Sequence, residues 1–392
     1  MRIYLDNNAT SPIHPVVHEA MSEALRSEFG NPSSVHREGQ MARRALENAR
    51  ESVASLIGAA PREIVFTSGG TESNNAAIFG LVSPAKRSHI VTTSIEHPSA
   101  LEPVRTLEQR GCRITRVGCD RRGRVDSGEM IAALGPETAL VVMMLANNET
   151  GVVQPVEPVS RACRERGIPL HCDAVQAAGR IALDVESLGA DTVALSAHKI
   201  QGPKGIGALW VRSGLTLEPL VVGGAQERRR RAGTESVPLA VGFGAAARLA
   251  GDPAGRERMA GLRERFESRV LAAIPDASIN GGDARRIPNT SSLRFAGADA
   301  EALVIALDLR GIAVSTGSAC SSGRVEPSRV LIEMGLSEED AASSIRISLG
   351  WRTTTEEIDR LVSTLEQIVP ENRRASARAV RAVRAEGNRE TA

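Results

Sequence analysis

Thr192-Val-Ala-Leu-Ser-Ala-His-Lys199 is an apolar run that ends in a serine, a histidine and a lysine. A second run of this kind, Pro169-Leu-His-Cys-Asp-Ala-Val-Gln176, lies upstream and ends in an aspartate and a glutamine. Short apolar runs bounded by polar residues are typical of strands that are buried on both faces of a sheet. Ligands bind beyond the carboxyl ends of such strands. Both stretches therefore predict a buried strand followed at once by side chains that can take part in chemistry.

The chain around these two runs alternates apolar runs with helical patterns. The predicted strands are 64–67, 90–93, 139–145, 169–172, 192–195 and 207–211, and the helices predicted between several of them include 41–57, 100–110 and 156–166. This alternation is typical of a mainly parallel sheet covered by helices on both faces, so we predict an α/β fold for this part of the chain.

The pattern changes from about Val237. Two helical stretches run to about Ala273, and the shorter segments that follow, at 278–280, 291–295, 302–309 and 345–349, predict a smaller α+β unit. We therefore predict a large domain at 12–251 and a small domain made of 1–11 and 252–370, with the boundary near Gly251-Asp-Pro.

The last residues, 371–392, form a basic tail with six arginines and few apolar side chains. Arg374, Arg378 and Arg381 are spaced so that they would share one face of a helix. A disordered tail is the alternative, because so few apolar side chains cannot form a core of their own.

The composition is that of an ordinary soluble globular protein. The chain has 392 residues, 42% hydrophobic residues and a formal net charge of +1, which argues against a dedicated nucleic-acid or membrane surface. Its first residues do not resemble a signal peptide, and its longest apolar run, 139–146, is far too short to span a bilayer. Five cysteines without a CxxC pair favour a reducing compartment. We therefore predict a cytoplasmic protein for which direct binding to nucleic acid is not expected.

Lys199 is one of only three lysines among 48 basic residues. Arginine cannot form a Schiff base because its guanidinium stays protonated, whereas a lysine can be made nucleophilic by burial and neighbouring charge. Asp173, 26 positions earlier, is a natural partner for a protonated pyridine nitrogen, and Gln176 would then hydrogen-bond the phenolic oxygen of the ring. A capping role for Asp173 in a short turn is the alternative. The pairing indicates pyridoxal 5'-phosphate (PLP) as the cofactor.

Ser68-Gly-Gly-Thr-Glu72 ends a predicted strand and opens a helix. Small residues such as Gly70 let backbone N–H groups reach a phosphate, the helix N-terminus supplies positive potential, and Thr71 adds a hydroxyl. Ser196 and His198 offer further donors beside the lysine. An ordinary turn with a helix cap is the alternative.

Several other polar residues have both a functional and a structural interpretation. His97 follows a strand, where its imidazole would stack on a cofactor ring or carry protons, although a surface or core histidine is the alternative. Arg346 lies in a strand pattern and predicts either a site for a substrate carboxylate or a salt bridge. Thr234 would meet a phosphate from a second subunit, whereas Lys204 is predicted to have a structural role. No His/Cys cluster has metal-ligand spacing, so we predict no catalytic metal.

Cys320 lies in Ser315-Thr-Gly-Ser-Ala-Cys-Ser-Ser-Gly-Arg324, a small, polar stretch that predicts a mobile surface loop. A thiol on such an arm can reach a site, collect a group and swing out, and an incidental exposed cysteine is the alternative. The other cysteines have helix or strand settings or flank a strand: Cys112, Cys119, Cys163 and Cys172.

These motifs together resemble the cysteine desulfurases of the NifS/IscS type, which are PLP enzymes of the class V aminotransferase family with the fold type I architecture. The resemblance extends to about Thr355, and the loop around Cys320 resembles that of the long-loop group. Ala225 stands where many relatives have glycine, and the tail matches no family pattern. The motifs are Tyr4-Leu-Asp-Asn-Asn-Ala-Thr10, Gly30-Asn-Pro-Ser-Ser34, Thr67-Ser-Gly-Gly-Thr-Glu-Ser-Asn-Asn75, Glu96-His97, Asn147-Asn-Glu-Thr-Gly151, Asp173-Ala-Val-Gln176, Ser196-Ala-His-Lys199, Gly202-Pro-Lys-Gly205, Arg231-Ala-Gly-Thr234 and Gly317-Ser-Ala-Cys320.

For the fold, the resemblance implies a large domain with a mainly parallel seven-stranded sheet and a smaller α+β domain. For the site, it implies that Lys199 holds PLP as a Schiff base and that His97 stacks on the ring and acts in catalysis. Asp173 and Gln176 would hold the ring nitrogen and the phenolic oxygen. The remaining implied contacts are Gly70, Thr71, Ser196 and His198 on the phosphate, Thr234 on the phosphate from the partner subunit of a homodimer, and Asn147 and Arg346 on the substrate carboxylate.

For the function, the resemblance implies the conversion of L-cysteine to L-alanine. Lys199 would remove the Cα proton, and Cys320, as a thiolate, would take the sulfur as a persulfide. An acceptor protein, such as an iron–sulfur scaffold or a nucleic-acid thiolation enzyme, would receive the sulfur. A selenocysteine lyase would share nearly every residue and is the main alternative. An aminotransferase would not need Cys320, and a non-catalytic interaction protein should have lost Lys199.

Overall fold

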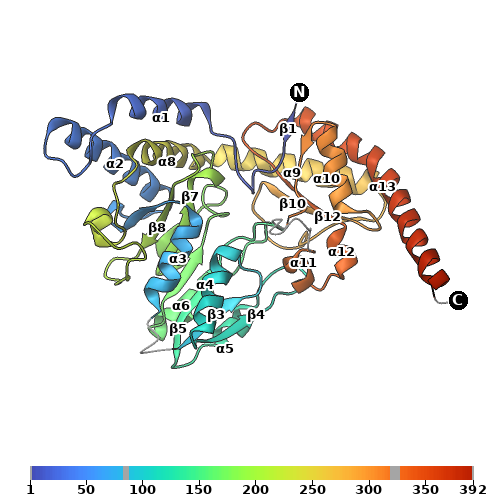
Figure 1. Ribbon diagram of the computed structural model, residues 1–392, viewed down its shortest axis with the longest axis horizontal. Helices are drawn as coiled ribbons and strands as arrows, with labels where there is room; N and C mark the ends of the chain where they lie inside the picture. The colour runs from blue at the N-terminus through green and yellow to red at the C-terminus, as the bar shows by residue number, and fades with distance from the viewer. Residues whose placement is uncertain (1, 83–87, 318–326, 391–392) are drawn as a thin grey trace.

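A computed structural model describes residues 2–82, 88–317 and 327–390 of the chain. Figure 1 shows two units side by side: a larger one built around a wide sheet, and a smaller one that holds the N-terminus and the C-terminal helix. The elements that connect the two units place the residues of the candidate site.

The larger unit is built around seven strands: β2 (Ile64–Thr67), β3 (His89–Thr93), β4 (Arg113–Val117), β5 (Thr138–Met144), β6 (Leu170–Asp173), β7 (Thr192–Ser196) and β8 (Gly207–Val211). Their order in the sheet is β2-β8-β7-β6-β5-β3-β4. Five neighbouring strands are parallel, in the order β7-β6-β5-β3-β4, whereas β8 is antiparallel to both β7 and β2. The predicted mainly parallel seven-stranded sheet is therefore confirmed.

Helices cover both faces of this sheet. They are α1 (Pro15–Ser27), α2 (Arg37–Leu56), α3 (Gly70–Leu81), α4 (Pro98–Gln109), α5 (Ser127–Ala132), α6 (Val156–Glu165), α7 (Val185–Leu188) and α8 (Val237–Ala250). Because neighbouring residues of a strand point to opposite faces, Val91 of β3 packs in one apolar cluster with α2, α6 and α8, whereas Ile90 packs in another with α3 and α4. The strands thus read as continuous apolar runs because both of their faces are buried.

The smaller unit has its own sheets and helices. A three-stranded antiparallel sheet has the order β12-β10-β9, and a two-stranded parallel pair joins β1 and β11. The strands are β1 (Ile3–Tyr4), β9 (Ala277–Ile279), β10 (Thr290–Phe295), β11 (Ile312–Ala313) and β12 (Ser344–Ser348). The helices are α9 (Pro253–Ala273), α10 (Ala300–Leu309), α11 (Arg329–Glu333), α12 (Glu338–Ala342) and α13 (Thr355–Glu390). Three short 3-10 turns complete the described elements: η1 (Pro61–Glu63), η2 (Ala197–Lys199) and η3 (Gln226–Arg229).

Each unit has its own apolar core, although residues in and directly beside α11 and α12 belong to the core of the larger unit: Val330, Leu331, Met334 and Ala341. Phe243 of α8 belongs to the core of the larger unit, whereas Phe266 of α9 belongs to that of the smaller one. Ile3 and Leu5 also pack in the smaller core, although they begin the chain. These clusters support the proposal that residues 1–11 belong with the small domain and that the boundary lies near Gly251.

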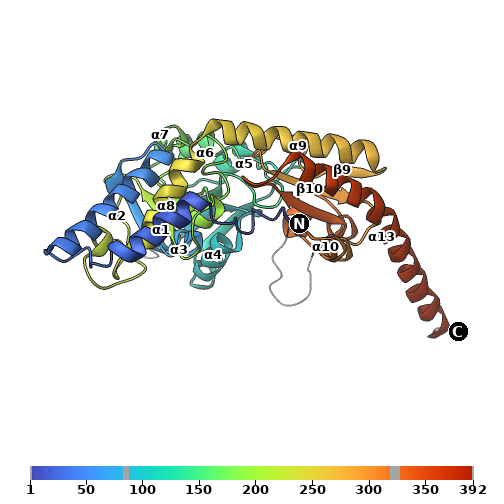
Figure 2. The ribbon, with the colours of Figure 1, turned by 90° about the horizontal axis from the view of Figure 1, so that it is seen from above.

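The C-terminal helix α13 extends through most of the basic tail. Figures 1 and 2 show its last turns leading away from the body of the molecule. Ile358, Leu361 and Leu365 anchor its first half in the smaller core. Within the described ranges, no helix is both long and apolar enough to cross a membrane.

Candidate active site

Lys199 lies in η2, directly after β7, and its amine points at the N-terminal segment. The Nζ atom donates to the carbonyl oxygens of Asn8 at 2.6 Å and Ala9 at 2.7 Å. Burial, followed by the nearby Arg180 and Arg346 guanidinium groups, lowers the pKa of Lys199 to about 8. A larger fraction of the amine is therefore neutral near physiological pH, which is the form that attacks a carbonyl group.

Asp173 ends β6, and the parallel pairing with β7 brings it beside the strand that leads to Lys199. Its Oδ1 accepts from the backbone N–H of Val175 at 3.0 Å, which is the turn role that the sequence left open. Its Oδ2 accepts from Asn74 of α3 at 2.7 Å. The Asn74 oxygen lies 3.0 Å from Nε2 of His171, so this amide is held with its N–H groups toward the aspartate. The buried carboxylate is thus fixed in one orientation.

Four of the five residues predicted to contact a phosphate line one pocket at the N-terminus of α3. Gly70, Thr71, Ser196 and His198 all line it, together with Thr10 and Lys204. The buried Ser196 Oγ has no partner among the described residues, so a hydroxyl is available there. A Cβ on Gly70 would lie 2.8 Å from Val175 Cγ2, and one on Gly207 would lie 2.6 Å from the Gly69 carbonyl carbon. Only glycine permits this close packing, which opens the helix N-terminus to the pocket. The pocket fits the phosphate group of PLP.

His198 completes this pocket as a neutral side chain. Its Nδ1 lies 3.1 Å from the hydroxyl of Thr10. Burial, followed by the positive charges of Lys199 and Lys204, lowers the pKa of His198 to about 4. Near neutral pH it can therefore form hydrogen bonds without adding a charge beside the lysine.

His97 caps the N-terminus of α4, and its ring remains exposed. Its Nδ1 accepts from the backbone N–H of Ser99 at 3.1 Å and lies 2.7 Å from the Ser99 hydroxyl. That hydroxyl accepts from Asn74, which also holds Asp173. The predicted ring-stacking residue and the predicted partner of the ring nitrogen are thus joined through two polar side chains that the sequence interpretation did not single out.

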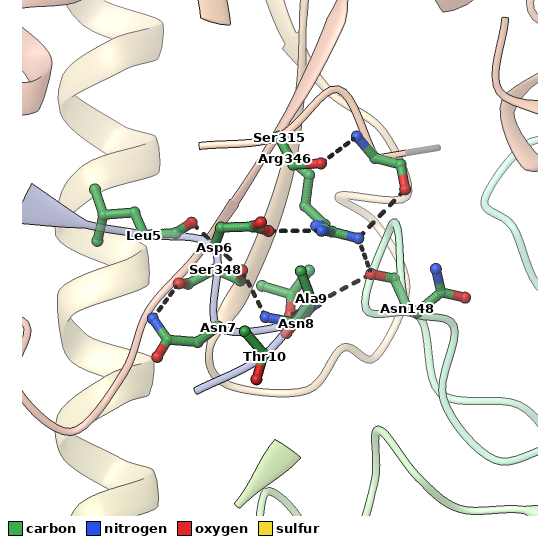
Figure 3. A network of polar contacts seen from close by, with 12 residues as sticks. Leu5, Asp6, Asn7, Asn8, Ala9, Thr10, Asn148, Ser315, Arg346 and Ser348 are labelled. Carbon is green, nitrogen blue, oxygen red and sulfur yellow. Dashed lines mark hydrogen bonds and ion pairs between the residues drawn. The ribbon is translucent and has the colours of Figure 1, made fainter. Parts of the chain in front are cut away.

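Arg346 of β12 is buried among the N-terminal residues, as Figure 3 shows. Its guanidinium pairs with Asp6 at 2.7 Å and donates to the carbonyl oxygens of Asn148 at 3.1 Å and Gly317 at 3.3 Å. The salt bridge that the sequence offered as one alternative is therefore present. A role toward a substrate carboxylate stays a prediction, and that carboxylate would compete with Asp6.

Asn147 follows β5 and is fully buried. Its Nδ2 donates to the carbonyl oxygen of Ile95 at 3.2 Å. Its Oδ1 accepts from the backbone N–H groups of Glu149 at 2.9 Å and Thr150 at 3.0 Å. The amide is thus used to form the turn after the strand, and its predicted contact with a substrate carboxylate stays a prediction.

One predicted phosphate contact, Thr234, lies apart from the pocket. Thr234 is exposed and outside the pocket lining, so within one chain it does not reach the phosphate position. Cys320 lies outside the described residues. The other four cysteines have pKa values raised by burial, to about 11 for Cys119, to about 12 for Cys163, and upward for Cys112 and Cys172. None of these four has the activated thiolate that sulfur chemistry needs.

The N-terminal segment Asp6–Ser11 is the part of the site that motif reasoning undervalued. It contacts Lys199 through the carbonyl oxygens of Asn8 and Ala9, Gln176 through that of Asn8, and His198 through Thr10 and Ser11. The motif Tyr4–Thr10 was visible in the sequence, but nothing local to it indicated which residues it would touch. In the described part of the chain, no cluster of three or more His, Cys, Asp or Glu residues is placed to bind a metal ion.

Glu96, which precedes the predicted stacking histidine, is a buried carboxyl group with an altered pKa. Its Oε1 accepts from the Thr93 hydroxyl at 2.7 Å and the Met144 N–H at 2.8 Å, and Oε2 has no partner among the described residues. Burial raises the pKa of Glu96 from 4.5 to about 8. Between about pH 4.5 and pH 8 the folded protein therefore holds a proton on Glu96 that the unfolded chain has released. The contribution of Glu96 to stability is lost as the pH rises through this range.

The Glu96→Gln variant is therefore expected to gain stability relative to the wild type as the pH rises. The two proteins should unfold at similar urea concentrations near about pH 5, and the variant should be more stable at about pH 9, by on the order of 1 kcal/mol for each pKa unit of the removed shift. Glu108→Gln is a matched control, because the hydrogen bond with Arg116 lowers the pKa of Glu108 and no such gain should appear. A stability difference that stays constant with pH would contradict this account of Glu96.

Comparisons with known proteins were made on the whole chain. A family model described as aminotransferase class-V matches residues 3–361. A cysteine desulfurase of Nostoc sp. is 47% identical over 371 residues, covering 94% of this chain and 92% of the relative. A cysteine desulfurase IscS of Dictyoglomus turgidum is 44% identical over 378 residues, covering 95% and 96%. Among solved structures, a NifS-like protein superposes with a TM-score of 0.87 at 37% identity, covering 94% of this chain and 100% of that one.

Proposed function

This chain belongs to the class V aminotransferase family and, within it, to the cysteine desulfurases, and from that premise we propose how it handles L-cysteine. It is a PLP-dependent cysteine desulfurase that releases L-alanine. The observation that carries this function is the pocket at the N-terminus of α3, next in sequence to a partly neutral lysine, with a fixed buried aspartate on the neighbouring strand.

The residues that would hold PLP come from α3, β6 and the turn after it, β7, η2 and the N-terminal cap of α4. When bound, PLP supplies an aldehyde that reacts with amines and a protonated ring that accepts negative charge. Lys199 would bind the aldehyde carbon, Asp173 would keep the ring nitrogen protonated, and His97 would stack on the ring. The phosphate contacts that we propose are Gly70, Thr71, Ser196 and His198, and Gln176 is the proposed donor to the phenolic oxygen.

The substrate is positioned and deprotonated by residues of this chain. The carboxylate of L-cysteine would displace Asp6 from Arg346, because a guanidinium binds a carboxylate through paired hydrogen bonds. The lysine amine, in its uncharged form, would take the Cα proton. Arg346 is buried and Lys199 is half-buried, so water competes weakly for these groups.

The sulfur atom of the substrate would be transferred to Cys320. A thiolate of Cys320 attacks the substrate sulfur, the new S–S bond forms as the C–S bond breaks, and the electron pair stays with carbon, which a proton then converts to the methyl group of alanine. No oxidant is needed, because the net products are alanine and a Cys320 persulfide. The raised pKa values of the four described cysteines support this assignment to the remaining one.

A homodimer is the proposed assembly. Large apolar side chains lie exposed on α1, on α2 and beside them, with Phe29 at 77% and Val35 at 89% exposed. Val222, near the loop that carries Thr234, is 83% exposed. Exposed apolar side chains of this size are typical of protein interfaces, and an interface here would bring Thr234 to the phosphate of the partner subunit.

The direct test is an assay of the purified protein with L-cysteine and with L-selenocysteine. One alanine should form for each L-cysteine consumed, with sulfide released only when a thiol reductant is present and without any keto acid. Rapid turnover of selenocysteine with negligible turnover of cysteine would instead identify a selenocysteine lyase, and a requirement for a keto acid would identify an aminotransferase.

The sulfur acceptor is proposed to be a protein of an iron–sulfur assembly or nucleic-acid thiolation system in the cytoplasm. The name of the relative IscS and the basic helix beyond Pro370 support a protein partner. A sulfur-transfer pull-down that compares the full chain with a variant ending at Pro370 tests the role of the tail. Equal transfer by both would place the docking surface elsewhere.

A further inference from the structure

Arg180 is a buried cation beside the active site. It is 5% exposed and follows β6 by a short turn. Its guanidinium donates to the side-chain oxygen of Gln176, to the backbone oxygen of Gln176 at 3.3 Å, and to the carbonyl oxygens of Asn7 and Lys199 at 3.3 Å each. These contacts join the β6 turn, the N-terminal segment and the lysine turn.

No carboxylate of the described residues forms an ion pair with Arg180. The other deeply buried arginines each have one: Arg50 pairs with Glu227, Arg286 with Glu267, and Arg346 with Asp6. Burial of an unpaired charge costs several kcal/mol unless hydrogen bonds replace the lost water. A neutral side chain would avoid this cost, so the position of the charge needs an explanation.

The first consequence concerns the amide of Gln176. A guanidinium can only donate hydrogen bonds, so Arg180 must hold the amide by its oxygen. The Nε2 group therefore faces away from Arg180, and it donates to the Asn8 carbonyl oxygen at 3.0 Å. Lys199 Nζ donates to the same oxygen at 2.6 Å. Arg180 thus turns the Nε2 donor of Gln176 toward an oxygen atom that Lys199 also contacts. The phenolic oxygen of PLP is likewise an acceptor for such a donor.

The second consequence concerns charge. The groups that face Lys199 are the cations Arg180 and Arg346, the carboxylates Asp6 and Asp173, and the imidazoles of His97 and His198. Asp6 neutralises Arg346 directly. Arg180 has no carboxylate partner of this kind among the described residues. Burial is the main cause of the lowered pKa of Lys199, and the charge of Arg180 is the next largest cause.

We propose that Arg180 is a positioning residue of the cofactor site: it sets the orientation of the Gln176 amide and holds the Asn7–Asn8 carbonyl segment against Lys199. This role rests on the proposed PLP-dependent function.

The test uses the holoenzyme and three variants. Arg180→Gln removes the charge, Arg180→Lys keeps the charge but not the forked donors, and Arg286→Gln makes the same change at a buried arginine of the smaller unit, away from the pocket. The readouts are the dissociation constant for PLP and the pH midpoint at which the visible absorption of the bound cofactor changes, with thermal unfolding as the measure of folding.

Arg180→Gln is expected to raise the pH midpoint by about one unit and to weaken PLP binding about tenfold. Arg180→Lys should keep the midpoint near the wild-type value while weakening PLP binding to a similar extent. Arg286→Gln should lower the unfolding temperature and change neither cofactor readout.

The proposal would be overturned if both Arg180 variants had the same pH midpoint and the same PLP affinity as Arg286→Gln. If Arg180→Gln does not fold, the PLP affinity of Arg180→Lys decides, because an unchanged affinity contradicts the positioning role. A wild-type protein that binds no PLP would contradict the proposed function itself, whereas wild-type binding with unaltered variants contradicts only the role of Arg180.

Discussion

Replacing Lys199 by alanine is expected to remove the visible absorption of the bound cofactor and to lower alanine formation from L-cysteine by a factor of about 10⁴ or more. The amine would supply both the covalent attachment and the base for the Cα proton, and the one other lysine among the described residues, Lys204, has a different setting. Lys204 lines the pocket at the N-terminus of α3 and is exposed. The change is measured by absorption spectroscopy of the purified protein and by alanine quantification.

Lys199→Arg serves as the matched comparison. It keeps a positive charge and much of the volume, and arginine is not a nucleophile at accessible pH. Both variants should therefore be inactive, and both should unfold within a few degrees of the wild type. Full turnover with an unchanged visible spectrum in Lys199→Ala would contradict the central role assigned to this residue.

Replacing Cys320 by alanine is expected to abolish transfer of sulfur to an acceptor and to lower alanine formation by about 10³-fold or more, as the loss of a catalytic nucleophile does. The visible spectrum of the bound cofactor should remain that of the wild type, which separates this defect from the Lys199 defect. Mass spectrometry of the wild-type protein after reaction with L-cysteine should show one additional sulfur atom on Cys320.

Cys119→Ala is the matched control for Cys320→Ala. Cys119 is the described cysteine that is least buried, and its pKa is raised to about 11 by burial and neighbouring carboxylates, so it should carry no persulfide. Its replacement should leave turnover unchanged. Wild-type turnover in Cys320→Ala, without dependence on a reductant, would remove the role proposed for this residue.

The strands of the sheet were predictable because their signal is local. Strand β7 was expected at 192–195 and spans Thr192–Ser196, and β8 was expected at 207–211 and spans those residues. Helix α2, expected at 41–57, begins earlier, at Arg37, because the His36 side chain caps it by accepting from the Gly39 N–H. A histidine is not among the usual capping residues, so the start of the helix carried no clear signal.

The arrangement of the site was less predictable. Ser196 and Gly70 were predicted as phosphate contacts, and the structure places both in the lining of one pocket. Asn74 and Arg180 were not singled out, because an asparagine in a helix and an arginine after a strand are ordinary in sequence. Their roles depend on contacts with residues 99 and 19 positions away.

By itself the sequence determined which segments become buried strands and which rare side chains follow them, because apolar runs and residue chemistry are properties of neighbours along the chain. That was enough to predict Lys199 and Asp173 as a cofactor pair. Only the tertiary structure decided which residues surround this pair. Asp6 reaches Arg346 across 340 positions, and Asn8 reaches Lys199 across 191. Such contacts form only when two cores pack against each other, and they determine the charge around the lysine.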